Sequence, residues 1–219
     1  MEVFGVLDPA PRIAVLDYGM GNLRSVTNAF RYVGADVHLI EEPHALRGFD
    51  GLVFPGQGAI VDCMRRLRET GFDTVIREWV AADRPFFGVC LGLQALFDHS
   101  EEGDTPGLGI FSGEVKRFQL PGNFKIPHMG WNTVSFRESA LMPEVPLANP
   151  AYYFVHSYYV SPLNFDLIWG EADYGGPFCA AIAFGNCFAT QFHPEKSQAS
   201  GLRLYREFIE LTRKRIPAQ

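Results

Sequence analysis

A chain of 219 residues with 47% hydrophobic and 20% charged residues has the composition of an ordinary globular protein, which excludes intrinsic disorder. Its formal net charge of -6 argues against a nucleic acid or an anionic membrane as partner, because both are usually bound by clustered lysines and arginines. We therefore expect one domain over residues 12–217, acting on a small polar substrate or a protein, and a loose arm over residues 1–11 before it.

The sequence carries no signal for export or membrane insertion. Residues 1–11 lack the basic and apolar regions of a signal peptide, and no later run reaches the roughly 18 apolar residues of a membrane helix. The four cysteines, at positions 63, 90, 179 and 187, have no spacing typical of a zinc or iron–sulfur site. We therefore expect reduced thiols, a cytoplasmic location, and neither a metal nor a cofactor.

Strands and helices are expected to alternate in the first half of the chain. Short apolar runs that end at glycine or proline predict strands, and apolar residues at helical spacing between them predict helices. The strands are expected over residues 12–16, 36–40, 51–54 and 86–89, and the helices over 21–33, 60–69 and 72–82. This alternation predicts an α/β fold with a mostly parallel central sheet, helices on both faces, and functional residues at the carboxyl ends of strands.

The second half is expected to be rich in β-structure. Its short extended segments are predicted near residues 114–119, 132–136, 152–160, 165–170, 178–184 and 187–192. The dipeptide Gly185-Asn186 lies between the last two segments and predicts a two-residue hairpin that pairs Phe184 with Cys187. A final amphipathic helix over residues 199–213 should close the sheet.

One cysteine stands where a strand is expected to pass into a helix. Cys90 lies between Gly88 and Gly92, after an apolar strand and before an expected helix over residues 91–97. The glycines relieve the crowding of a sharp turn, and the first turn of a helix supplies free N–H groups and a positive end that favours the thiolate. This is the context of a nucleophile elbow. The alternative, a buried structural cysteine, is the preferred interpretation for the other three cysteines.

A histidine and a glutamate are candidates for the base and its orienting group. In an extended segment 191–195, every second side chain faces the same way, so His193 and Glu195 would share one side. The intervening proline blocks a helix, so the imidazole can face a thiol while the carboxylate accepts from its other nitrogen. A solvated strand end is the alternative. His128 and His156 are interpreted as core or interface residues, and no two histidines have the spacing of zinc ligands.

Several segments together resemble a known family. Class I glutamine amidotransferases have motifs similar to G-V-C-L-G-L-Q at 88–94, F-P-G-Q-G at 54–58 and H-P-E at 193–195. The glutaminase subunits of imidazole glycerol phosphate synthases resemble this chain more closely, at D-Y-G-M-G-N-L (17–23), M-R-R-L (64–67), P-H-M-G-W-N (127–132) and Q-F-H-P-E-K-S (191–197). The resemblance covers nearly the whole chain from residue 12 and implies a single flavodoxin-like domain.

The resemblance implies a glutaminase mechanism. The Cys90 thiolate would attack the amide carbon of L-glutamine, ammonia would leave, and water would hydrolyse the thioester, with His193 relaying protons and Glu195 orienting it. The oxyanions would be stabilised by two backbone N–H groups, those of Leu91 and of Gln57. The family carries valine at the position of Gln57, in a P-G-V-G loop whose backbone can flip. With glutamine at this position, the resemblance does not determine how the loop flips here.

The same resemblance assigns the substrate contacts. They would come from Gly56, Gly58, Gln94, Glu102 and the backbone of Ser157 and Tyr158. Glu102 would bind the α-amino group. The alternatives are an ordinary helix residue for Gln94 and a solvated acidic pair for Glu101 and Glu102.

The resemblance also implies a partner. The family forms a heterodimer with a (β/α)-barrel cyclase, which receives ammonia and makes imidazole glycerol phosphate and an aminoimidazole carboxamide ribotide in histidine biosynthesis. The expected docking face comprises Gly19, Asn22, His128, Trp131 and Asn132, with Trp131 as an anchor or, more simply, a core residue.

Three other functions are compatible with the sequence. The chain could serve another synthase, such as one making anthranilate, aminodeoxychorismate or pyridoxal phosphate, but segments 17–23 and 127–132 speak against this. It could be a non-catalytic binding module, which the intact Cys90, His193 and Glu195 make the weaker hypothesis. A stand-alone cysteine hydrolase would need substantial activity without any partner.

Overall fold

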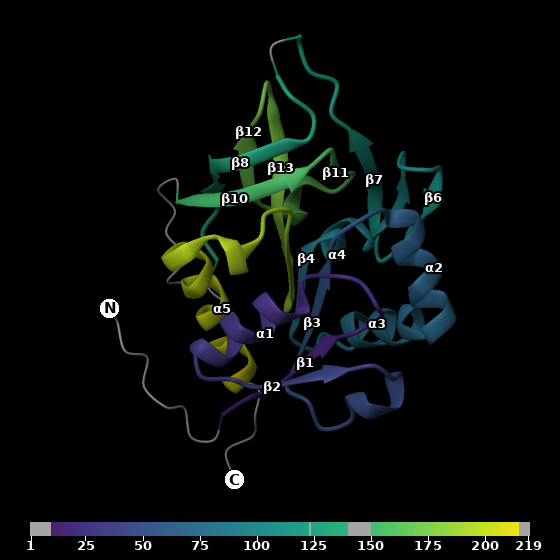
Figure 1. Ribbon diagram of the computed structural model, residues 1–219, viewed down its shortest axis with the longest axis vertical. Helices are drawn as coiled ribbons and strands as arrows, with labels where there is room; N and C mark the ends of the chain where they lie inside the picture. The colour runs from purple at the N-terminus through teal and green to yellow at the C-terminus, as the bar shows by residue number, and fades with distance from the viewer. Residues whose placement is uncertain (1–9, 123, 140–149, 215–219) are drawn as a thin grey trace.

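The computed structural model describes residues 10–122, 124–139 and 150–214. Most of the expected arm over residues 1–11 and the last residues of the expected domain therefore lie outside the described residues. The described chain forms a twelve-stranded sheet, with a separate two-stranded sheet beside it (Figure 1).

The first half alternates between strands and helices, as the sequence predicted. Its elements are β1 Arg12–Leu16, α1 Leu23–Tyr32, β2 Asp36–Ile40, the 3-10 turn η1 Pro43–Leu46, β3 Gly51–Gly56, α2 Ile60–Thr70, α3 Phe72–Ala81, β4 Phe86–Cys90 and α4 Leu91–Gln94. The sheet order β2-β1-β3-β4-β14 joins these strands to β14, Cys187–Thr190, and every neighbouring pair in that series is parallel. The predicted mostly parallel central sheet is confirmed.

Alternating side chains of β1 show how the sheet is covered on both faces. Ile13 and Val15 belong to an apolar cluster that also contains buried residues of α1 and α5, the helix Gln198–Arg213. Ala14 and Leu16 belong to a second cluster, with buried residues of α2 and α3. Figure 1 shows the two pairs of helices on opposite sides of the sheet. All four strand residues are fully buried, so burial of apolar surface holds the helices in place.

The second half is rich in strands, again as predicted. Its remaining elements are β5 Phe97–Ser100, β6 Thr105–Pro106, β7 Phe111–Arg117, β8 His128–Thr133, β9 Ser135–Phe136, β10 Ala151–His156, β11 Tyr158–Pro162, η2 Phe165–Leu167, β12 Ile168–Asp173, β13 Pro177–Phe184 and η3 Pro194–Lys196. The hairpin at Gly185-Asn186 is confirmed, because Phe184 pairs with Cys187. β8 and β10 form the two-stranded sheet, and β10 leads through Ser157 into β11 of the main sheet.

The expected helix over residues 91–97 was wrong in its second half. α4 is one turn long, and Phe97 begins strand β5. Residues 91–97 are all buried, so their apolar pattern carries no helical periodicity that could mark an end. The carbonyl of Leu96 accepts from the N–H groups of Ile110 and Phe111, and the carbonyl of Phe97 accepts from Gly109. These long-range hydrogen bonds draw the chain out of the helix.

Tyr152 places a hydroxyl in the aromatic core. Its side chain is fully buried and its ring stacks on Phe192 at 4.0 Å, but the hydroxyl has no hydrogen-bond partner in the described part of the chain. Because an unpaired buried hydroxyl costs roughly 1–3 kcal/mol, Tyr152→Phe should raise the free energy of unfolding by about 1 kcal/mol. Urea denaturation measures the change. Tyr18→Phe is the matched control, because the Tyr18 hydroxyl donates to Pro55 O at 3.2 Å; it should lower stability. A loss of stability in both variants would contradict the prediction.

Candidate active site

Cys90 occupies a sharp turn at the carboxyl end of β4. It is the last residue of that strand and immediately precedes α4, and its backbone has φ 54° and ψ -102°. A positive φ is rare for a residue with a side chain and marks a backbone held in place by its surroundings. The turn is tightly packed: a Cβ at Gly92 would lie 2.1 Å from Phe54 O, so only glycine fits there. Cys90 is thereby held at the N-terminus of α4, 7% exposed.

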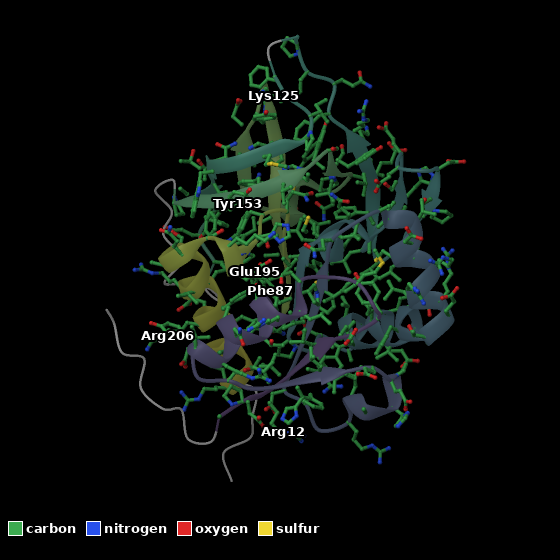
Figure 2. The ribbon with its side chains drawn as sticks, viewed as in Figure 1. Arg12, Phe87, Lys125, Tyr153, Glu195 and Arg206 are labelled. Carbon is green, nitrogen blue, oxygen red and sulfur yellow. The ribbon has the colours of Figure 1, made fainter. Side chains whose placement is uncertain are left out.

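His193 and Glu195 reach the same edge of the sheet from β14. Thr190, the last residue of β14, pairs in parallel with Val89 of β4, so the two segments that follow these strands leave the sheet side by side. The His193 Nδ1 and Glu195 Oε1 atoms are 2.8 Å apart, and both side chains are almost completely buried. His193 is extended, as expected, but the backbone does not stay extended to residue 195, because Glu195 lies in the 3-10 turn η3. In Figure 2, Glu195 is labelled between Tyr153 above it and Phe87 below it.

The second ring nitrogen of His193 is free to act on a neighbour. Nε2 is buried and has no hydrogen-bond partner among the described residues. Burial opposes the charged imidazole, but the Cys90 thiolate and the Glu195 carboxylate outweigh it and raise the pKa of His193. The imidazole is therefore able to hold a proton next to Cys90, as the base of a cysteine nucleophile must.

Gln191 is a residue of the site to which the sequence interpretation gave no role. Its Nε2 lies 3.5 Å from Cys90 Sγ, and its Oε1 accepts from Gln94 Nε2 at 3.1 Å. Gln94 Nε2 also donates to Tyr158 O, at 3.0 Å. The sequence did contain a signal for this role: Gln191 stands two residues before His193, in a segment whose alternate side chains face the same way. A fully buried amide at that place is expected to be hydrogen-bonded.

A cavity of about 330 Å³ opens onto these side chains. Its lining includes eight of the predicted site residues: Gln57, Gly58, Cys90, Gln94, Glu102, Ser157, Tyr158 and His193. Pro127, Val155, His156 and Lys196 complete it. Gly56 and Leu91 do not line it: both are buried and packed together, and a Cβ at Gly56 would lie 2.7 Å from Leu91 Cβ.

Glu102 caps a helix as well as lining the cavity. Its Oε2 accepts the backbone N–H of Ile60 at 2.9 Å, at the start of α2. The helix N-terminus is a favourable place for a carboxylate. Glu102 is therefore not simply a solvated acidic residue, and only part of its hydrogen-bonding capacity is used by that cap.

The expected docking residues have different environments. Gly19 is exposed, Asn22 is half-buried at the start of α1, and Trp131 is 51% exposed, so it is not a core residue. Asn132 is half-buried and donates to Asp173 O at 2.8 Å. The expectation that His128 belongs to the docking face was wrong. Its side chain is 3% exposed and stacked between aromatic rings, so it does not contribute to a docking surface.

The buried imidazoles of His128 and His156 should make stability depend on pH. They share a hydrogen bond of 3.0 Å, and burial lowers their pKa values to about 4 and about 3, respectively. Between about pH 4 and 6.5 these two groups bind protons in the unfolded chain that they do not bind in the folded chain, so their contribution to stability is complete above about pH 6.5 and is lost as the pH falls. The expected slope is about 1.4 kcal/mol per pH unit for each such proton.

Denaturant unfolding between about pH 5 and pH 7.5 tests this expectation. His128→Phe should be less stable at neutral pH and show a shallower dependence. His38→Gln, which removes an exposed imidazole outside the buried pair, is the control. Equal slopes for the wild-type chain and His128→Phe would refute the assignment.

Burial is the largest influence on the other three cysteines. Cys63, Cys179 and Cys187 are free and buried, and burial raises the pKa of each thiol, to about 12 for Cys63. In the part of the chain that the structure describes, no group of three or more His, Cys, Asp or Glu side chains could hold a metal ion. Within the same part, none of the helices has the length and apolar character that a membrane crossing requires.

Comparison with known proteins places this chain in a family. The family model for class-I glutamine amidotransferases matches residues 14–211. Imidazole glycerol phosphate synthase subunit HisH of Acinetobacter baylyi is 49% identical over 205 residues, 91% of this chain and 98% of that protein. The subunit of the same name from Dechloromonas aromatica is 47% identical over 207 residues, 90% of this chain and 95% of that protein.

Solved structures agree on the fold. A glutamine amidotransferase superposes with a TM-score of 0.71 at 21% identity, over 91% of this chain and 98% of that chain. PurLQS from Thermotoga maritima has a TM-score of 0.70 at 14% identity, over 92% of this chain and 98% of that chain. The chain belongs to the class-I glutamine amidotransferase family and, within it, to the HisH subunits of imidazole glycerol phosphate synthase.

Proposed function

We propose that this chain hydrolyses L-glutamine to L-glutamate and ammonia, with Cys90 as nucleophile, His193 as general acid and base, and Glu195 as its orienting group. One observation carries the proposal: Cys90 and the buried His193–Glu195 pair meet at the carboxyl ends of the adjacent parallel strands β4 and β14. Sites at this edge of a parallel sheet are the rule in α/β folds.

The proposed chemistry has two halves. Cys90 Sγ, as the thiolate, attacks the amide carbon of glutamine, and the tetrahedral intermediate expels ammonia when His193 Nε2 gives its proton to the leaving nitrogen. Water then attacks the thioester carbon, with the neutral His193 taking the proton of that water. The carbon–sulfur bond breaks, glutamate leaves, and the thiolate and imidazolium are restored.

Two oxyanions form along this route and need donors. The N–H of Leu91 opens α4, and the first N–H groups of a helix have no partner within it. The N–H of Gln57 is the proposed second donor. The loop that carries it is anchored next to the site, because the Tyr18 hydroxyl donates to Pro55 O at 3.2 Å. The donor is backbone, so glutamine at this position is compatible with the role.

The hydrogen bonds around the cavity indicate how glutamine would be held. Both N–H groups of the Gln94 amide are used, by Tyr158 O and by Gln191 Oε1, so its own Oε1 is left to accept from the substrate. Tyr158 lies opposite Arg117 in the β11–β7 ladder, while Ser157 O accepts from Phe118 N. Since hydrogen-bonded and non-bonded positions alternate in such a ladder, the Tyr158 N–H points away from β7, toward the cavity.

The α-amino group of glutamine would bind at Glu102. One of its oxygens caps α2 and the other is available, so a positively charged group can pair with the carboxylate without breaking the cap. Gly56 and Gly58 would shape the loop that covers the substrate.

The ammonia is proposed to pass to a (β/α)-barrel cyclase in a heterodimer that makes imidazole glycerol phosphate and an aminoimidazole carboxamide ribotide. The relatives at 49% and 47% identity are named as subunits of that synthase. Trp131, 51% exposed, and Met129, 62% exposed, lie together on β8 and supply an apolar docking surface, with Gly19 and Asn22 as further contacts. A cytoplasmic location is part of the proposal.

Ammonia release from glutamine tests the function. The chain should be measured alone, with the cyclase subunit, and with the cyclase plus its phosphorylated ribotide ligand. Low release by the chain alone that rises steeply with both additions is the expected result. High release by the chain alone would indicate a stand-alone hydrolase, and none under any condition would indicate another synthase partner or a non-catalytic module.

An electrophilic glutamine analogue gives an independent readout. It should label Cys90 and leave the other thiols unmodified, because burial raises the pKa of Cys63, Cys179 and Cys187. Mass spectrometry of peptides from the labelled complex locates the adduct. Labelling at any of those three cysteines instead would contradict the assigned nucleophile.

A further inference from the structure

A chain of hydrogen bonds runs behind the cavity through two buried imidazoles. His156 Nδ1 lies 2.8 Å from Tyr158 O, and His156 Nε2 lies 3.0 Å from His128 Nδ1. His128 Nε2 is in turn 3.4 Å from Asn132 Nδ2, a nitrogen that also donates to Asp173 O. The two histidines are 3% and 6% exposed, and they pair directly across the β8–β10 ladder.

The Tyr158 carbonyl, at one end of this series of hydrogen bonds, determines which ring nitrogen of each histidine carries the proton. A carbonyl only accepts, so His156 carries its proton on Nδ1 and presents Nε2 as an acceptor. His128 must then donate from Nδ1, and its Nε2 accepts from Asn132. Each imidazole thus uses both nitrogens in a single neutral tautomer. A second proton on either ring would set two donors against each other.

The chain continues from Tyr158 to the nucleophile. Tyr158 O accepts a second hydrogen bond, from Gln94 Nε2, and the Gln94 amide leads through Gln191 to Cys90 Sγ. His156 and Gln94 therefore meet at one carbonyl oxygen at the cavity wall, and each is linked to a second side chain, His128 and Gln191, respectively. His156 itself also lines the cavity.

We propose that His128 and His156 are positioning residues of the glutaminase site: they hold the Tyr158 carbonyl, and with it the Gln94 amide, in the orientation that binds glutamine. This proposal rests on the proposed function. The carbonyl has two lone pairs and both are occupied. If the hydrogen bond from His156 is lost, the Gln94 amide is the remaining side-chain partner of the Tyr158 carbonyl. Gln94 Oε1 then no longer has a fixed direction toward the substrate.

Packing alone does not explain the pair. The surroundings are aromatic, with Phe118, Phe154 and Phe178 around the two rings, and a phenylalanine would fill such a space without burying a polar group. The imidazoles also link two parts of the molecule. His128 is the first residue of β8, the strand that also carries the exposed Trp131. Its hydrogen bond to His156 connects this strand to the Tyr158 backbone, which borders the cavity.

Steady-state kinetics with the cyclase complex test the role. His156→Phe and His128→Phe should raise the KM for glutamine about five- to thirty-fold, the effect of one misdirected buried hydrogen bond, and lower kcat less. Alkylation of Cys90 by iodoacetamide does not use the glutamine contacts, so its rate should stay within about two-fold of the wild-type rate. An unchanged KM in both variants would overturn the proposal.

Phe118→Leu is the matched control. It removes packing from the same cluster, since the Phe118 ring lies 5.2 Å from that of His156. The hydrogen bonds that link His128, His156, Tyr158 and Gln94 stay in place. It should lose stability and keep its KM. If Phe118→Leu raises the KM as much as the histidine variants do, the pair is structural only and the proposal fails.

Nitrogen-15 NMR of the unsubstituted full chain tests the hydrogen-bond assignment without reference to activity. Two of the six histidines should carry the proton on Nδ1 and show no titration between about pH 5 and pH 8. Protons on Nε2 of both rings would overturn the proposal even if glutaminase activity is present. Conversely, this signature in a chain without glutaminase activity would refute the proposed function and leave only the hydrogen-bonded pair.

Discussion

Alanine at position 90 is expected to abolish glutamine hydrolysis while leaving the fold intact. Removal of a nucleophile that works with a base costs roughly 10⁴- to 10⁶-fold in kcat, and no other thiol in the described part of the chain lines the cavity. The substitution deletes one sulfur atom, which Gln191 Nε2 approaches to 3.5 Å. Cys90 already has a side chain at φ 54°, so alanine adds no backbone strain. Ammonia release by the cyclase complex measures the loss.

Cys179→Ala is the control for this prediction. It removes the same atom from a buried thiol that lies in β13, outside the cavity, so it should cost stability but leave kcat unchanged. The circular dichroism spectrum of Cys90→Ala should match that of the wild-type chain. Turnover within ten-fold of wild type in a folded Cys90→Ala chain would refute the nucleophile assignment.

The central sheet could be predicted because its signals are local. Runs such as residues 12–16 and 36–40 are short, apolar and bounded by turn residues, and the structure gives β1 and β2 those same limits. The run at 91–97 was misjudged because it is buried all round. There, hydrogen bonds from Gly109, Ile110 and Phe111 decide the conformation, and a local pattern cannot show them.

The candidate site was predictable where chemistry and spacing coincide. Cys90 has its glycines and its strand-to-helix junction, and His193 and Glu195 are two residues apart in one segment. Gln191 and His156 were not assigned to the site, because their roles depend on which backbone carbonyl or side chain lies opposite them. Gln191 meets Gln94 across 97 positions of sequence, and such a pairing exists only once the sheet has formed.

His193→Ala is expected to cost more activity than Glu195→Gln. The alanine variant lacks the group that gives and takes protons, so it should lose nearly as much as Cys90→Ala. Glutamine at 195 can still accept from His193 Nδ1, now at 2.8 Å from Oε1, and the Tyr205 hydroxyl, 3.4 Å from Oε2, can accept from the new amide. Orientation is kept in part, and the loss should be smaller by about one to two orders of magnitude.

The charge of Glu195 adds a second, separable effect. The carboxylate is one of the groups that raise the pKa of His193, so Glu195→Gln should lower that pKa toward its ordinary value. Since proton donation to the leaving ammonia needs the imidazolium, the alkaline limb of the kcat profile should then move to lower pH. Glu171→Gln, an exposed carboxylate on β12, should leave the limb in place. If Glu195→Gln shows the larger loss, Glu195 must do more than orient the imidazole and raise its pKa, because neither effect could exceed removal of the imidazole itself. An unmoved limb would contradict the assigned effect of the carboxylate on the pKa of His193.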